Sequence, residues 1–337
     1  MNPHFIGIGA QKAGTTWLYE RMQAHPEVWM PYQKELHYFD ERVGQRVTLQ
    51  SRVRGSRPCD LRWRLQVKHW KKNRQSWSPA ELWWWARYFA TSRYDDRWYL
   101  GLFAPAGDRI SGDISPRYAL IDSDAISHLH SVLPETRILY FARHPVERAW
   151  SQALMELPRR VGPQFGDADL RRDFDAPAAQ ARASYAETLD RWMERFPPEQ
   201  IFLGFFEDIV LRPDQLLDTV CDFIGLSHLP SKGADLRKAA NKGRTQAIPA
   251  RHARYLAQLY LPLVESLPPR LGIYADWWVY STQQLAGLSD DAEDIPYPFL
   301  HGPMFEAWKA TAGLRPDETP PLASGRLDQV AARVTAG

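Results

Sequence analysis

The chain has 337 residues, of which 44% are hydrophobic and 24% are charged, and its 42 basic and 40 acidic side chains leave a net charge of +2. This composition excludes a largely disordered chain, and the near-neutral balance argues against a dedicated nucleic-acid binder. Two cysteines, Cys59 and Cys221, are too few for a disulfide framework and favour a reducing compartment. Because we find neither a signal-peptide pattern nor an apolar run of the roughly 20 residues that a transmembrane helix needs, we expect a soluble, cytoplasmic protein.

Apolar runs and helical patterns alternate along the chain. The run at 5–8 predicts a strand, a loop of small and polar residues follows, and residues 16–22 have the apolar spacing of a helix. The further predicted elements are strands at 137–142 and 200–205 and helices at 123–132, from about 146, at 183–196 and at 215–224, the last with Gly225 as C-cap. Continuous apolar runs are typical of strands buried in a parallel sheet, and such sheets bind ligands at the carboxyl ends of their strands.

Two regions depart from this alternation. Residues 41–105 are rich in Arg, Lys and Trp and predict a long insertion between elements of the sheet. Residues 281–337 are Pro-rich and loosely patterned, which predicts an extension that either packs over the core or is partly disordered. We therefore predict one α/β domain over residues 1–280, with the insertion at about 41–105, and a C-terminal extension over 281–337.

The loop after the first predicted strand has the frame of a phosphate-binding loop. Residues 9–16 read GAQKAGTT, and a Gly-x-x-x-x-Gly loop between a strand and a helix can hold a tetrahedral anion with its backbone N–H groups. The Walker pattern requires lysine directly after the second glycine, but Thr15 occupies that position and the lysine lies inside the loop, at Lys12. Lys12 also stands where a dinucleotide-binding loop requires its third glycine.

Residues 9–18, GAQKAGTTWL, resemble the 5′-phosphosulfate loop of sulfotransferases that use 3′-phosphoadenosine 5′-phosphosulfate (PAPS). The resemblance implies a P-loop-containing, three-layer α/β/α domain with a central parallel sheet. It also implies that the donor, once it has lost its sulfuryl group, leaves as adenosine 3′,5′-bisphosphate (PAP). The residues that it assigns to the donor site are Gln11, Lys12, Ala13, Gly14, Thr15, Thr16 and Trp17.

Three later segments extend this resemblance. Residues 143–151, RHPVERAWS, are similar to the family's 3′-phosphate motif, which implies that Arg143 and Ser151 hold that phosphate. The segment 241–244 resembles a late Lys-Gly-Arg segment, which implies that Lys242, Gly243 and Arg244 close over the bound nucleotide. Residues 112–118, GDISPRY, are similar to a Gly-Glu-x-Ser-Pro-x-Tyr stretch with Asp113 in place of Glu, and we expect them to have a supporting role.

Residues 34–40, KELHYFD, look like the Lys-Glu-x-His-Phe-Phe-Asp stretch of the carbohydrate (heparan-type) sulfotransferases. The resemblance implies that Glu35 is the catalytic base, with His37 as the alternative, and that Lys12 neutralises the leaving bisphosphate. On an extended strand, Glu35 and His37 would point to the same side. We expect burial beside the donor to raise the pKa of Glu35.

The composition of the insertion indicates an acceptor site but does not identify the acceptor. Basic side chains dominate residues 52–74, which predicts either a rim that attracts an anionic glycan or a solvated helix face. The aromatic residues of the insertion could stack on sugar rings. For most of them we favour a place in the core of a helical cap. They are Trp83, Trp84, Trp85, Trp98 and Tyr99.

The sequence thus predicts a PAPS-dependent sulfotransferase that transfers a sulfuryl group in line to a hydroxyl or amine of a small-molecule or glycan acceptor. No metal site is predicted, because the histidines are scattered and neither cysteine lies in a CxxC pair. Two alternatives stay open at this point: a P-loop nucleoside or metabolite kinase, which would need Mg²⁺ and a triphosphate, and a non-catalytic nucleotide-binding module. The sequence leaves the oligomeric state undetermined.

Overall fold

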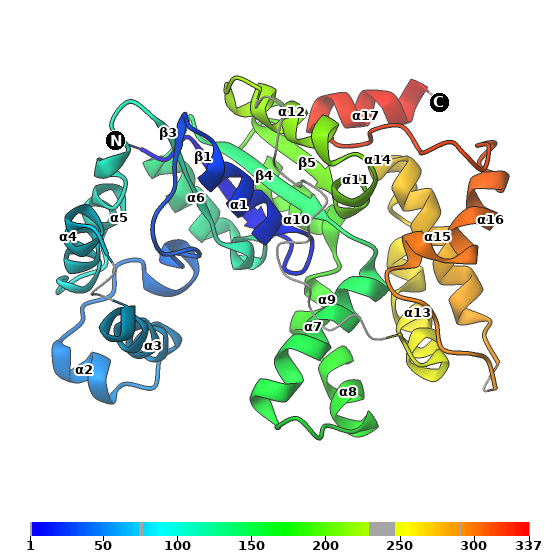
Figure 1. The fold of residues 1–337 in the computed structure, drawn as a ribbon, viewed down its shortest axis with the longest axis horizontal. Helices are drawn as coiled ribbons and strands as arrows, with labels where there is room; N and C mark the ends of the chain where they lie inside the picture. Colours follow the sequence, from blue (N-terminus) through cyan, green and yellow to red (C-terminus); the bar gives the residue numbers. More distant parts are fainter. Residues whose placement is uncertain (1, 74–76, 229–246, 290, 337) are drawn as a thin grey trace.

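A mostly parallel β-sheet lies at the centre of the computed structural model, which describes residues 2–73, 77–228, 247–289 and 291–336 (Figure 1). Within these residues the strand order is β2-β3-β1-β4-β5-β6, and β6 alone runs antiparallel to its neighbour. The strands are β1 (Phe5–Gly9), β2 (Val28–Trp29), β3 (Ile110–Ile114), β4 (Arg137–Ala142), β5 (Ile201–Phe205) and β6 (Gly325–Arg326).

The three strands predicted from apolar runs are confirmed as β1, β4 and β5. All residues of β1 and β5 are buried, as expected for strands covered on both faces. The sequence analysis did not predict β2, β3 or β6, because β2 and β6 have two residues each and β3 is interrupted by Gly112 and Asp113. These three strands widen the sheet on both sides of the predicted centre.

Helices cover both faces of the sheet and confirm the predicted three-layer α/β architecture (Figure 1). The predicted helices are present, and Gly225 adopts the left-handed conformation of a C-cap. No helix among the described residues is both long and apolar enough to cross a bilayer. The helices of this part are α1 (Thr15–Ala24), α6 (Ser123–Val132), α7 (Pro145–Arg160), α8 (Asp167–Phe174), α9 (Pro177–Ala181), α10 (Tyr185–Met193), α11 (Phe206–Leu211) and α12 (Pro213–Ile224).

The insertion forms a helical lobe beside the β2 edge of the sheet (Figure 1). It contains α2 (Leu49–Arg54), α3 (Pro58–Asn73), α4 (Pro79–Phe89) and α5 (Asp96–Gly101). Its aromatic residues mostly form a core, as the sequence predicted for most of them: Trp84, Trp85, Trp98 and Tyr99 are buried, whereas the Trp83 side chain is 78% exposed. Trp83 alone of these five therefore remains available to a ligand.

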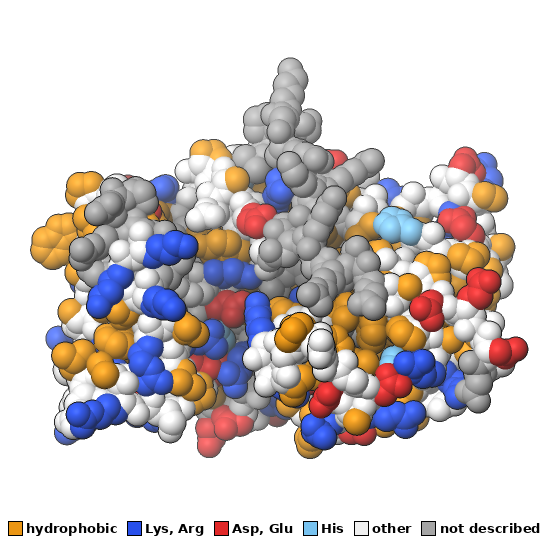
Figure 2. All heavy atoms as spheres, turned by 60° about the horizontal axis from the view of Figure 1, so that its bottom comes forward, with side chains coloured by type: hydrophobic (Ala, Val, Ile, Leu, Met, Phe, Trp, Pro, Cys, Tyr) orange, Lys and Arg blue, Asp and Glu red, His pale blue; other side chains and the backbone are white. Residues whose placement is uncertain are grey.

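The basic run of the insertion divides into structural and exposed side chains. The buried Arg52 donates to the carbonyl oxygens of Phe89 and Thr91, and Arg57 pairs with Asp60 at 2.7 Å. Arg64 donates to three backbone carbonyls, the shortest contact being 2.6 Å. The exposed cations of this run include Arg54, Lys68, Lys71 and Lys72. Figure 2 shows basic and apolar side chains interspersed on one face of the molecule.

The C-terminal part is integrated with the sheet. The boundary predicted at residue 281 falls inside α15 (Ile273–Ala286), which packs against α13 (Ala250–Val264). The short α14 (Pro268–Leu271) connects these two helices, and α16 (Pro303–Thr311) and α17 (Leu327–Ala336) follow. Asp208 accepts hydrogen bonds from the backbone N–H (2.8 Å) and hydroxyl (2.6 Å) of Ser324, which fix the chain beside β5 just before β6.

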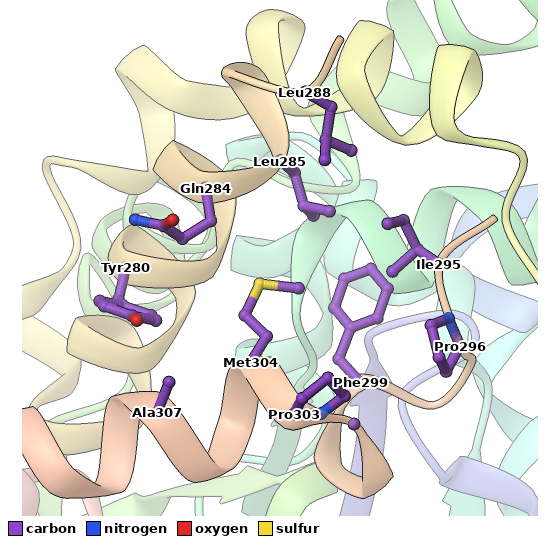
Figure 3. Close-up of a pocket in the computed structure, with 11 residues that line it drawn as sticks. Tyr280, Gln284, Leu285, Leu288, Ile295, Pro296, Phe299, Pro303, Met304 and Ala307 are labelled. Carbon is purple, nitrogen blue, oxygen red and sulfur yellow. The ribbon is translucent and has the colours of Figure 1, made fainter. Parts of the chain in front are cut away.

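An apolar pocket of ≈ 320 Å³ lies between α15 and the chain that follows it (Figure 3). Gln284 and Leu285 line it from the helix, and Leu288, Ile295 and Phe299 line it from the following chain. The pocket contains none of the residues that the sequence assigns to catalysis. It therefore shows how the C-terminal chain is packed rather than where the chemistry takes place.

Candidate active site

The loop between β1 and α1 leaves the first turn of the helix open to an anion. Gly14, the N-cap of α1, has φ of 92° and no side chain that could occupy the free N–H groups. A Cβ atom built at Gly14 would come within 2.2 Å of Ile209 Cδ1, so both the backbone conformation and the packing favour glycine. Ala13, Thr15 and Trp17 are buried around this turn. The predicted phosphosulfate loop therefore has the geometry of an anion-binding site.

Positive side chains surround this loop. Lys12 Nζ lies 3.5 Å from Met155 Sδ, and burial together with nearby Arg143 and Arg159 lowers the pKa of Lys12. Lys34 Nζ donates to Thr16 Oγ1 at 2.8 Å. Such mutual repulsion between cations is relieved when a multiply charged anion binds among them.

Gln11 has an unsatisfied polar atom at the same loop. Its Oε1 is buried and has no hydrogen-bond partner within the part of the chain that the structure describes. A buried polar atom without a partner is uncommon in folded proteins and is often found where a ligand or water binds. Gln11 is therefore consistent with its predicted place in a ligand site.

Arg143 follows β4 directly and reaches back to the loop. Its Nη1 donates to the Lys12 carbonyl oxygen at 3.1 Å, and its Nε and Nη2 each donate to Glu147 Oε2 at 3.0 Å. Burial would lower the pKa of Arg143, but the Tyr297 hydroxyl and the Glu147 carboxylate outweigh burial and raise it. Arg143 therefore remains a cation at the carboxyl end of the sheet. Ser151 lies half-buried two helical turns further along α7.

The other predicted nucleotide contacts lie outside the described residues: Lys242, Gly243 and Arg244. Two residues whose side chains hydrogen-bond to the Arg143 guanidinium were not predicted from the sequence. Glu147 lies within the 143–151 motif, in the first turn of α7, and its position four residues after Arg143 is a signal that could have found it. Tyr297 lies 154 residues away in the C-terminal extension, where no local pattern marks it.

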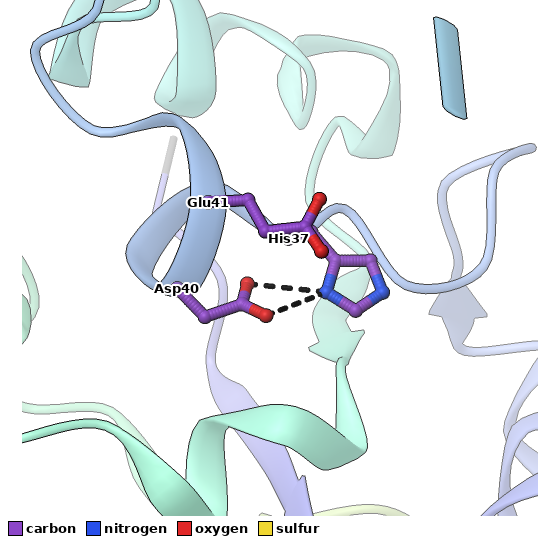
Figure 4. A group of neighbouring side chains, drawn as sticks. All are labelled: His37, Asp40 and Glu41. Atoms are coloured by element: carbon purple, nitrogen blue, oxygen red, sulfur yellow. Dashed lines mark hydrogen bonds and ion pairs between the residues drawn. The ribbon is translucent and has the colours of Figure 1, made fainter. Parts of the chain in front are cut away.

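The prediction that Glu35 and His37 lie on an extended strand is wrong. Both residues adopt positive φ angles, 64° at Glu35 and 53° at His37, so the chain turns sharply here. Their side chains nevertheless meet, with His37 Nε2 lying 3.2 Å from Glu35 Oε2. His37 is fully buried, and its Nδ1 lies 2.8 Å from Asp40 Oδ2 (Figure 4). The Glu35 side chain, in contrast, is 32% exposed. Glu35 is therefore the member of this group that a substrate can reach.

The pKa of Glu35 also differs from the expectation. Burial raises it, as predicted, but the hydrogen bond with His37 and the charge of Lys34 outweigh burial, so the pKa of Glu35 lies below its ordinary value. For His37, burial lowers the pKa, but Asp40 and Glu35 outweigh burial and raise it above 6.5. Glu35 is consequently ionised at neutral pH, and its hydrogen-bond partner is a buried imidazole whose protonated form is favoured relative to that of a free histidine.

Residues of the 112–118 motif hold this sharp turn from behind. Asp113 Oδ1 accepts a hydrogen bond from Ser115 Oγ at 2.8 Å and lies 3.5 Å from the backbone nitrogen of Leu36. Ser115 Oγ in turn accepts from the backbone N–H of His37 at 3.4 Å. Burial raises the pKa of Asp113 to about 6, although hydrogen bonds from Ser115 and Tyr118 oppose it. These contacts account for the supporting position that the sequence assigned to the motif.

His37, Asp40 and Glu41 bring three potential metal ligands within 4.8 Å of one another (Figure 4). Arginines already neutralise the carboxylates: Arg117 Nη1 donates to Glu41 at 2.6 Å, Arg117 Nε lies 3.5 Å from Asp40, and Arg62 Nη2 lies 3.4 Å from Glu41. A metal ion would have to compete with these two guanidinium groups. We therefore interpret this group as an ion-pair cluster that orients His37.

Comparison with known proteins places the chain in a family. The profile of the Sulfotransferase family matches residues 3–230, which include the phosphate loop, Glu35, His37 and Arg143. The chain belongs to the sulfotransferase family. This assignment confirms the family that the sequence motifs predicted. Tyr297 lies beyond the matched region.

Two curated relatives are similar in sequence to this sulfotransferase. Heparan sulfate glucosamine 3-O-sulfotransferase 6 of Mus musculus is 28% identical over 167 residues, 45% of this chain and 48% of the relative. The protein of the same name from Homo sapiens is 28% identical over 138 residues, 39% of this chain and 40% of the relative. The chain thus spans about half the length, or less, of these relatives.

A sulfotransferase from Alicyclobacillus acidocaldarius is similar in structure, with a TM-score of 0.50 and 21% identity, covering 80% of this chain and 95% of that one. This likeness confirms the predicted fold class.

Proposed function

We propose that this sulfotransferase transfers a sulfuryl group from PAPS to a hydroxyl or amine of a carbohydrate or other small acceptor. One observation carries the proposal: Lys34 Nζ lies 2.8 Å from Thr16 Oγ1 and 3.6 Å from Glu35 Oε1. A single ammonium group thus joins the phosphate loop to the candidate base. A donor held by the loop would place its sulfur within reach of an acceptor that contacts Glu35.

The donor would bind along the carboxyl ends of β1 and β4. Its 5′-phosphosulfate fits the open N-terminus of α1 together with Lys12 and the loop residues Gln11, Ala13, Gly14, Thr15, Thr16 and Trp17. Its 3′-phosphate would contact Arg143 and Ser151, with Lys242, Gly243 and Arg244 closing over the nucleotide. The basic residues Arg143 and Lys12 lie next to each other, as the two phosphorylated ends of PAPS require.

The reaction forms a bond between the acceptor oxygen or nitrogen and sulfur, and it breaks the bond between sulfur and the 5′-phosphate oxygen. PAP leaves with the bonding electron pair, and Lys12 stabilises the negative charge that develops on its 5′-phosphate. The acceptor proton passes to Glu35. Although the pKa of Glu35 is low, the acceptor becomes strongly acidic as its bond to sulfur forms, so an ionised carboxylate is a sufficient base.

Glu35 fits the role of base better than His37. Both ring nitrogens of His37 are engaged, Nδ1 with Asp40 and Nε2 with Glu35, and the ring is fully buried. An acceptor could reach His37 only by displacing Glu35. We therefore assign His37 as a positioning residue that orients Glu35 and keeps it ionised.

A glycan acceptor is supported by two features. The curated relatives are named for their action on heparan sulfate glucosamine. The exposed Lys68, Lys71 and Lys72 of α3, together with the exposed Trp83, would provide charge and a stacking surface for an anionic sugar chain.

The buried free thiols of Cys59 and Cys221 are consistent with a cytoplasmic location.

Two measurements test the proposal. Calorimetry should show that PAP binds equally well with and without ATP and Mg²⁺. Incubation with ³⁵S-labelled PAPS and a panel of glycans, amines and phenols should label an acceptor, and Lys12→Ala should slow this transfer by about 10²–10³-fold. Phosphate transfer from ATP instead would establish a kinase, and PAP binding without transfer to any cellular extract would favour a nucleotide-binding module.

A further inference from the structure

Contacts within the protein occupy most of the Arg143 guanidinium. An arginine offers five N–H donors. Among the described residues, four hydrogen bonds use them: two to Glu147 Oε2, one to the Lys12 carbonyl oxygen and one, of 2.7 Å, to the Tyr297 hydroxyl. The bidentate grip that an arginine normally offers to a phosphate is therefore taken up by Glu147. A phosphate beside Arg143 needs a further hydrogen-bond donor.

The Tyr297 hydroxyl can be that donor. It accepts its hydrogen bond from Arg143 Nη2, which leaves the phenolic proton to donate in turn. Tyr297 is half-buried, so its side chain is neither sealed in the core nor free in solvent. The Arg143 guanidinium also lies 5.2 Å from the centre of the Tyr297 ring, which keeps the two groups side by side.

The chain around Tyr297 is fixed on both sides. Ile295 forms two backbone hydrogen bonds with Ile248, of 2.8 and 2.9 Å. The backbone N–H of Phe299 donates to Glu147 Oε1 at 2.5 Å, so the carboxylate that holds Arg143 also holds this chain. Ile295 and Phe299 line the apolar pocket beside α15, where their side chains anchor the segment further (Figure 3). The position of Tyr297 is thus built into the fold before any ligand arrives.

We propose that Tyr297 is a donor-site residue whose hydroxyl, held by Arg143, donates a hydrogen bond to the 3′-phosphate of the nucleotide. The proposal rests on PAPS being the donor, as argued above. It assigns a specificity-determining contact to the C-terminal extension, outside the region that the family profile matches. The chemistry that Tyr297 recognises is an adenosine nucleotide that carries a phosphate on its 3′-oxygen, as distinct from one with a free 3′-hydroxyl.

The test compares two nucleotides on one variant. For Tyr297→Phe we expect the Kd for PAP to rise by about 10- to 100-fold, because the variant loses one hydrogen bond to a charged group. The Kd for adenosine 5′-monophosphate, which lacks the 3′-phosphate, should change less than about twofold. Tyr280→Phe is a matched control, since Tyr280 lines the apolar pocket and is expected to leave both constants unchanged. Tyr297→Gln, which restores a donor and an acceptor, should recover part of the PAP affinity.

The outcomes separate this inference from the proposed function. If the wild-type protein does not bind PAP, the proposed function fails together with the inference. If the wild-type protein binds PAP and Tyr297→Phe binds it equally or more tightly, only the inference is overturned. The ratio of the two dissociation constants reports on folded molecules alone, so partial unfolding of a variant does not mask the result.

Discussion

Replacing Glu35 by glutamine separates catalysis from donor binding. Glutamine has the size of glutamate. Its amide oxygen can still accept a hydrogen bond from His37 Nε2, which in the wild-type protein lies 3.2 Å from Glu35 Oε2. The variant loses the carboxylate that we propose accepts the acceptor's proton, so we expect kcat to fall by about 10²–10⁴-fold, or about 3–5 kcal/mol in activation free energy. Among the residues that the structure describes, Glu35 meets the phosphate loop only through Lys34, at 3.6 Å, so the Kd for PAP should change little.

The assay is the initial rate of sulfate transfer from labelled PAPS at saturating donor and acceptor, with PAP binding measured on the same preparation. Glu20→Gln is the matched control, because the Glu20 carboxylate also raises the pKa of Lys34 but makes no hydrogen bond to His37 among the described residues. It removes the same charge from the neighbourhood of Lys34 and should keep near-normal turnover. A Glu35→Gln enzyme whose kcat stays within tenfold of the wild type would refute the base assignment.

Three further predictions address how the site is held. His37→Leu removes the hydrogen bond that lowers the pKa of Glu35, so the acidic limb of the kcat profile should move to higher pH; an unmoved limb would show that His37 does not set the pKa of Glu35. Gly14→Ala forces a side chain into a backbone with φ of 92° and against Ile209, so urea unfolding should show a loss of about 1–3 kcal/mol, and full stability would contradict the strain. Burial raises the pKa of Asp113 from 3.8 to about 6. Protonated Asp113 therefore stabilises the fold fully below pH 3.8, and this stabilisation is lost by about pH 6, a change of roughly 3 kcal/mol in the free energy of unfolding. Urea unfolding at pH 4 and pH 7 should show that Asp113→Asn gains stability relative to the wild type as pH rises. The same change in unfolding free energy for both proteins would argue against this burial.

Features fixed by neighbouring residues could be predicted from the sequence. The strand, loop and helix around Gly14 follow from local apolar spacing and one glycine frame, and Arg143 follows its strand directly. The left-handed turn at Glu35 could not be predicted, because it depends on Asp113, which is 77 residues away from the Leu36 nitrogen that it holds. The place of Tyr297 depends likewise on contacts that only the folded chain brings together.

Parallel pairing of the central strands explains why distant segments meet in one site. Phe5 of β1 lies opposite Gly112 of β3 and Arg137 of β4, so the carboxyl ends of all three strands reach the same edge of the sheet. The phosphate loop, the Asp113 support and Arg143 follow from these three ends. The antiparallel β6 runs away from this end of the sheet, and among the described residues the C-terminal extension makes no hydrogen bond to Arg143 through that strand. It reaches Arg143 instead through the segment that Ile248 and Glu147 hold, and this segment accounts for how the proposed donor contact of Tyr297 can lie so late in the chain.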